Sequence, residues 1–119
     1  MYFDHSATTP VHPDVQNLIN ITQKEVYGNP SSTYSPGKKA RILLEKARKQ
    51  IAKSINTIPS KIIFNSGGTE ANNHVLWSML GSNKNHIISN KIEHPAVTKV
   101  LQRLKNFGLE HCLIKVNKN

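Results

Sequence analysis

The sequence predicts an α/β fold, and two features of its pattern lead to this class. Short apolar runs rich in β-branched residues, typical of buried strands, alternate with longer segments whose apolar residues recur at helical spacing. The stretch from Lys61 to Asn73 joins one such run to a glycine turn and the start of a helix. Alternating strands and helices pack in layers, but the pattern leaves open whether the strands are adjacent or parallel.

Two helices are expected in the first half of the chain. Pro13 suits the first position of a helix that should run to about Tyr27. A second helix should follow, with Ser35 as its cap and Pro36 as its first residue, and end near Ile55. Between them, the loop at 28–32 contains glycine, asparagine, proline and serine, which interrupt helices.

The second half should contain three strands and two helices. Strands are expected at 61–65, 86–90 and about 110–116. Helices are expected at 69–80, ending before Gly81, and at about 95–106, beginning at Pro95 and ended by Gly108. We therefore expect an N-terminal extended segment at 1–12 and a partial α/β domain at 13–119.

Composition limits the class of protein. The chain has 119 residues, of which 37% are hydrophobic, as in a globular protein. No apolar run approaches the roughly 20 residues of a membrane span, and residues 1–4 do not resemble a signal peptide. A single cysteine, Cys112, excludes an internal disulfide and is expected to be a small buried residue in its strand. These features predict a cytoplasmic protein without membrane association.

The net charge of +9 has two interpretations. It could serve nucleic-acid binding, or it could reflect a lysine-rich surface that is simply solvated. We favour the second because the chain lacks interleaved aromatic residues on which bases would stack. The six histidines show no spacing typical of a metal site, so no metal is expected. The densest basic group lies along the second expected helix: Lys38, Lys39, Arg41, Lys46, Arg48, Lys49 and Lys53.

The turn at Ser66-Gly67-Gly68 has the features of an anion site. Its two glycines lack a Cβ and allow a ligand to approach the backbone closely. The helix that follows presents free backbone N–H groups and the positive end of its dipole at the same place. Thr69 adds a hydroxyl donor. The turn therefore suits a phosphate group, although an ordinary strand–helix turn would read the same way.

Four motifs together resemble the N-terminal portion of the NifS-like cysteine desulfurases, pyridoxal phosphate enzymes of the class V aminotransferase group. The resemblance covers nearly all of this chain. In order and spacing, the motifs are Asp4-His5-Ser6-Ala7-Thr8-Thr9-Pro10, Gly28-Asn29-Pro30-Ser31-Ser32, Ser66-Gly67-Gly68-Thr69-Glu70-Ala71-Asn72-Asn73 and Glu93-His94-Pro95-Ala96-Val97.

The resemblance implies a fold and a set of cofactor contacts. The fold is the N-terminal part of the large domain of aspartate aminotransferase-like, pyridoxal phosphate-dependent transferases, with an incomplete sheet. Gly68 and Thr69 match residues that contact the cofactor phosphate, and His94 matches the histidine that stacks on the cofactor ring. Thr8, Thr9 and the 29–32 loop match motifs near the active site, but local capping explains them equally well.

The resemblance also implies that several functional residues of the family have no counterpart among these 119 residues. The family's Schiff-base lysine, the aspartate that pairs with the pyridine nitrogen and the persulfide cysteine have no counterparts here, so no catalytic residue is assigned. We expect a truncated protein that does not release sulfur from L-cysteine by itself, and that self-associates or pairs with a complementary C-terminal chain. The alternatives are a non-catalytic phosphate- or cofactor-binding remnant and a basic nucleic-acid-binding protein.

Overall fold

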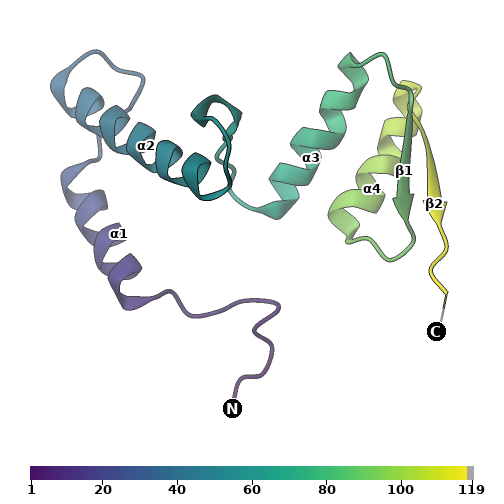
Figure 1. Ribbon diagram of the computed structural model, residues 1–119, viewed down its shortest axis with the longest axis horizontal. Helices are drawn as coiled ribbons and strands as arrows, with labels where there is room; N and C mark the ends of the chain where they lie inside the picture. Colours follow the sequence, from purple (N-terminus) through teal and green to yellow (C-terminus); the bar gives the residue numbers. More distant parts are fainter. Residues whose placement is uncertain (118–119) are drawn as a thin grey trace. The chain divides into compact units, whose positions relative to one another are not determined.

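The structure, a computed structural model, describes residues 1–117 and confirms the α/β class. The chain forms two compact units, Met1–Ile62 and Ile63–Asn119, which we describe separately as the first and second unit. Within the described residues, no helix combines the length and apolar character needed to cross a bilayer. The elements in chain order are α1 (Pro13–Glu25), α2 (Ser35–Ser54), η1 (Pro59–Lys61), α3 (Gly68–Ser78), η2 (Met79–Gly81), β1 (His86–Asn90), α4 (Pro95–Leu104), η3 (Lys105–Phe107) and β2 (Glu110–Ile114) (Figure 1).

Both helices of the first unit begin near the expected prolines. The imidazole Nδ1 of His12 accepts the backbone N–H of Asp14 at 3.3 Å and caps α1. The expectation that Ser35 caps α2 is wrong, because Tyr34 holds the cap position and makes no side-chain capping bond. Pro36 restrains the first turn of α2 instead, since its ring fixes φ near the helical value.

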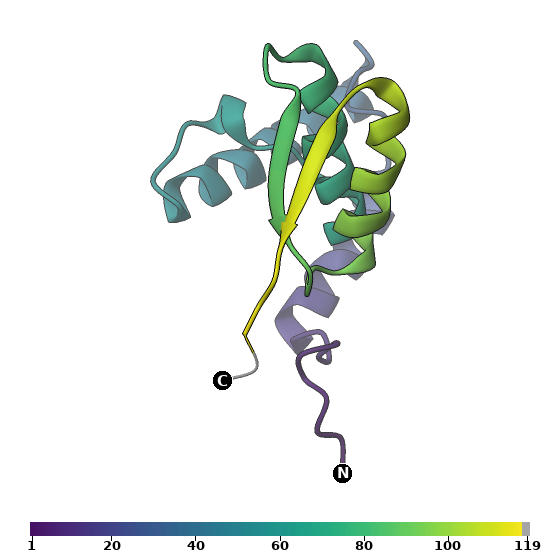
Figure 2. The same cartoon turned by 90° about the vertical axis from the view of Figure 1, so that its right-hand side faces the viewer.

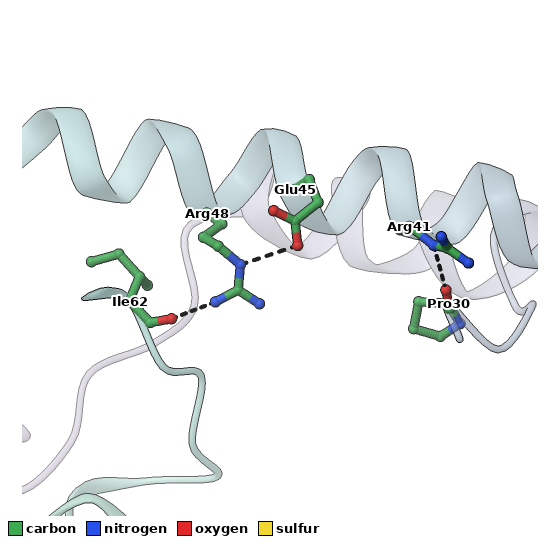
Figure 3. A network of polar contacts seen from close by, with 5 residues as sticks. All are labelled: Pro30, Arg41, Glu45, Arg48 and Ile62. Atoms are coloured by element: carbon green, nitrogen blue, oxygen red, sulfur yellow. Dashed lines mark hydrogen bonds and ion pairs between the residues drawn. The ribbon is translucent and has the colours of Figure 1, made fainter. Parts of the chain in front are cut away.

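The loop at 28–32 is held against the start of α2. The Arg41 guanidinium donates to the backbone carbonyl of Pro30 at 2.9 Å (Figure 3). It also donates to the backbone carbonyl of Ser32 at 3.3 Å. A Cβ on Gly28 would lie 2.4 Å from the carbonyl carbon of Pro36, and one on Gly37 would lie 2.5 Å from the carbonyl oxygen of Asn29. Glycine is therefore required at both positions for the loop and helix to approach this closely.

A second arginine of α2 holds the end of the first unit. The Arg48 guanidinium pairs with the Glu45 carboxylate at 3.1 Å and donates to the backbone carbonyl of Ile62 (Figure 3). Its side chain is 22% exposed, so this pairing is less screened by water than an ordinary surface ion pair. Arg41 and Arg48 thus both have structural roles in the first unit.

The second unit is a parallel β1–α4–β2 crossover with α3 packed on α4. His86 of β1 pairs with Glu110 of β2, and the register continues to Asn90 with Ile114. Figure 2 shows the two strands side by side with the helices on one side of them. The core cluster contains Val100, Leu104 and Leu109, against which Leu76, Trp77, Met79 and Ile87 pack. Each fully buried leucine of this kind contributes about 1.5–3 kcal/mol through removal of apolar surface from water.

The expected strand at 61–65 does not form. Lys61 ends the short helix η1, and residues 62–65 have no assigned helix or strand. Ile62 has an extended backbone, with φ −93° and ψ 123°, but a strand also needs a partner for its backbone groups, and β1 and β2 pair only with each other. Ile63 and Phe64 remain 61% and 43% exposed.

Two expectations about the second unit's glycines and cysteine have different outcomes. Gly108 ends the last helical turn in the left-handed region, at φ 84°, as expected of a glycine after a helix. Cys112 is exposed, so the expectation that it is buried is wrong. Its side chain points to the sheet face opposite the helices, with Ile88 and Ile114, which are 67% and 59% exposed.

Candidate functional site

The glycine turn opens α3 as the sequence suggests. The first bond of the α3 ladder runs from the Ala71 N–H to the Gly67 carbonyl at 3.1 Å. The amides of Gly68, Thr69 and Glu70 precede this bond and need acceptors from outside the helix. A Cβ built on Gly67 or Gly68 would meet no atom within 4 Å, so the space above this backbone is open. The turn therefore leaves room for a ligand beside its backbone.

Glu70 closes the turn from the side of the helix. Its carboxylate accepts the backbone N–H of Ser66 at 2.7 Å and the Ser66 hydroxyl at 2.5 Å. These hydrogen bonds hold the pKa of Glu70 below its usual value, the hydroxyl having the larger effect. Glu70 therefore fixes Ser66, the residue before the two glycines.

His94 lies at the cap of the next helix. Its Nδ1 accepts the backbone N–H of Ala96 at 3.1 Å, so the proton of the neutral ring is on Nε2. Pro95 follows at the first position of α4. The cap restricts the imidazole ring and leaves Nε2 available to a ligand.

Packing of α3 on α4 brings together two of the three predicted cofactor contacts, Thr69 and His94, while Gly68 does not line their pocket. Thr69 and His94 line one open pocket of about 330 Å³, in which Asn73 and Lys99 also take part. The Asn73 amide donates to the carbonyl of Thr69 at 2.8 Å, so Asn73 braces its own helix. The pocket is thus bordered by the start of α3, by His94 and by Lys99.

The remaining sequence motifs lie in the first unit. Thr8 and Thr9 precede α1, in a segment without helix or strand. The Asn29 carboxamide accepts the N–H of Ser31 at 2.9 Å, which is the local capping considered from the sequence. Among residues 1–117, no three histidine, cysteine or acidic side chains come close enough to hold a metal ion.

Comparison with known proteins identifies the family. The profile described as Aminotransferase class-V matches residues 1–119. The chain belongs to the aminotransferase class-V family. This family is pyridoxal phosphate-dependent, and the resemblance to NifS-like cysteine desulfurases is confirmed.

Individual relatives of this class-V chain support the same family assignment. It is 38% identical over 121 residues to cysteine desulfurase IscS of Dictyoglomus turgidum, covering 99% of this chain and 31% of the relative. It is 40% identical over 120 residues to selenocysteine lyase of Xenopus laevis, covering 88% of this chain and 28% of that protein. The chain therefore spans about a third of the length of the curated relatives it matches.

Solved structures of similar proteins share the fold of this chain. A NifS-like protein superposes with a TM-score of 0.86 and 34% identity, covering 96% of this class-V chain and 32% of the other. The structure of SspA in complex with cysteine gives a TM-score of 0.83 and 31% identity, covering 95% and 33% of the two chains. The two-stranded sheet of this chain is therefore part of a partial α/β domain with that fold.

The residues present fit the phosphate end of the family's cofactor. The space that side chains at Gly67 and Gly68 would occupy is open, and three backbone amides and the Thr69 hydroxyl are available there. Sequence reasoning missed Lys99, although Lys99 follows Pro95 by four residues, one helical turn along α4. That spacing could have indicated a cation beside the pocket.

Proposed function

We propose that this chain forms the phosphate- and ring-binding part of a pyridoxal phosphate site in a NifS-like cysteine desulfurase that acts on L-cysteine. The observation that carries the proposal is the single pocket lined by both Thr69 and His94. The two residues are far apart in sequence, and each lies at the start of its own helix. Two cofactor contacts inferred from separate motifs thus share one site.

Each residue has a definite role in this proposal. The amides of Gly68 and Thr69, with the Thr69 hydroxyl, donate to the phosphate oxygens, and the dipole of α3 favours their charge. His94, held by its cap bond to the Ala96 amide, places its ring against the cofactor ring. Bound pyridoxal phosphate supplies the electron sink for bond cleavage at the substrate.

The sulfur-releasing reaction requires a lysine amine and a reactive thiol, and no motif in these 119 residues matches either group. Covalent catalysis by this cofactor needs an activated lysine amine, and a sulfur acceptor must be a reactive thiol. We propose that these groups come from a complementary polypeptide or from further sequence, and that the 119 residues alone bind cofactor without turnover. Sulfide and alanine release from L-cysteine by the pure chain would contradict this part.

The binding site is tested with a cofactor analogue. Because the chain has many lysines that react with aldehydes, we choose 4′-deoxypyridoxine 5′-phosphate, which lacks the aldehyde. Its Kd is measured by titration calorimetry for the chain and for Thr69→Val and His94→Asn. Thr69→Val should weaken binding about tenfold, since a charge-assisted hydrogen bond is worth about 1.5–3 kcal/mol. His94→Asn removes the ring but keeps a capping side chain, so a loss of about threefold or more reports ring contact.

Matched controls separate this site from general effects. Thr33→Val and His74→Leu change the same residue types at exposed positions outside the pocket. They should leave the Kd unchanged. Equal losses in the site and control variants, or an analogue that binds no better than its form without phosphate, would refute the proposed site.

A further inference from the structure

The outer face of α2 carries a row of lysines that the local structure does not use. Lys46, Lys49 and Lys53 have i, i+3 and i+7 spacing and share one side of the helix. Ile42, one turn earlier, lies on the same side and is 72% exposed. We name these four residues the lysine face. They line an open groove of about 530 Å³.

Three of the other basic residues of α2 are engaged locally, and Lys38 lies near the start of the helix. Lys39 lies 3.9 Å from the Glu25 carboxylate, Arg41 binds loop carbonyls, and Arg48 binds Glu45 and the Ile62 carbonyl. No hydrogen bond or ion pair within the described residues involves the ammonium groups of the three lysines of the lysine face. Glu45 also lines the groove, but its carboxylate is paired with Arg48, so the repulsion among the three lysines is at most partly offset in a chain of net charge +9.

We propose that the lysine face is a docking surface for an acidic, amphipathic segment of another protein. Charge complementarity requires an anionic partner, because repeated positive charges along one side of a helix match carboxylates at similar spacing. Ile42 and the aliphatic lysine stems add an apolar contact in the same groove. A segment with acidic residues around an apolar one satisfies both requirements.

Nucleic acid fits these observations less well. A phosphate backbone offers no apolar group to Ile42, and no aromatic side chain lines the groove to stack on a base. The side of α2 opposite the lysine face carries Ala40, Leu44 and Ala47, which line an apolar cleft together with Val26, the residue that follows α1. The lysine face is therefore directed away from this apolar cleft, although Lys46 also borders a pocket lined by Leu18 and Ile19 of α1.

The test uses the full 119-residue chain and a labelled peptide of repeating Glu-Glu-Leu-Glu units, with fluorescence anisotropy as the readout. A combined K46Q, K49Q and K53Q variant should raise the peptide Kd about tenfold, and added salt should weaken binding of the unchanged chain. The matched control combines K24Q, K84Q and K91Q, which removes the same charge from exposed positions elsewhere. It should change the Kd less than twofold, and far-UV circular dichroism checks that both variants are folded.

Two further comparisons decide the chemistry of the partner. Ile42→Ser should weaken the leucine-containing peptide severalfold but leave a peptide with serine in place of leucine unchanged. Absence of peptide binding at low salt, or equal losses in the two triple variants, would overturn the proposal. Tighter binding of a DNA duplex or of phosphatidylserine vesicles, with the same dependence on these lysines, would also overturn it. Thr69→Val should not affect peptide binding, so the result is independent of the cofactor site.

Discussion

Replacing Leu104 with alanine tests whether the small core of the second unit carries its stability. Leu104 is fully buried in the cluster with Val100 and Leu109. A leucine-to-alanine change at such a position destabilises a protein by about 2–5 kcal/mol. A unit of roughly 60 residues has a total stability of about 3–9 kcal/mol. We therefore expect the variant to lose a large part of its folding free energy.

The assay uses the single tryptophan of the chain. Trp77 packs on the cluster and contacts the Phe107 ring edge-on at 5.2 Å, so its fluorescence reports unfolding of this unit. With a urea m-value of about 1 kcal/mol/M for so small a unit, Leu104→Ala should lower the midpoint by about 2 M or more. Val75→Ala, at a 65% exposed position of α3, should shift it by less than about 0.5 M. Similar shifts for both variants would refute the assignment of the core.

Three further outcomes follow from local contacts. The hydrogen bonds from Ser66 lower the pKa of Glu70 from 4.5. The stability they contribute is therefore present above about pH 4.5 and is lost as the pH falls through the lower pKa of the folded chain. An NMR titration should find a higher Glu70 midpoint in Ser66→Ala, and an unchanged midpoint would contradict this. Gly28→Ala places a Cβ 2.4 Å from a backbone carbon of α2 and should destabilise the first unit by about 1–3 kcal/mol in thermal melts, unlike Gly81→Ala, whose Cβ meets nothing within 4 Å. Exposed Cys112 should react with Ellman's reagent as completely in the native chain as in denaturant; protection in the native chain would show that it is covered.

Helix positions could be predicted because their determinants are local. Pro13 and Pro95 occupy the first positions of α1 and α4, and Gly108 supplies the left-handed residue after the last turn. The strand at 61–65 could not be decided in this way. Its apolar residues suit a strand, but pairing depends on another strand distant in sequence, and no such partner is present among the described residues.

Cys112 shows the same limit in the sheet itself. Alternation places Cys112 and His111 on opposite faces of β2, but the sequence does not reveal which face the helices cover. The packing of α4 against one side decides it, and Cys112 lies on the other.

Thr69 and His94 of the candidate site were predicted from their motifs, but Lys99 was missed and the assembly of the site could not be predicted. The motifs place Thr69 and His94 at two helix starts, which the structure bears out. Only the contact between α3 and α4 shows that they share a pocket with Lys99. Their contacts with the cofactor remain a prediction for the binding experiment.

The parallel register of β1 and β2 has a consequence for the order of folding. Residue His86 meets Glu110 only after the chain has passed through all of α4, so no tight turn can start the pairing of these strands. The entropic cost of closing this long connection must be offset by the free energy gained when the leucines of α4 pack against α3. Substitutions that weaken this helix contact should therefore slow the arrival of the second strand, even where they leave the strands themselves unchanged.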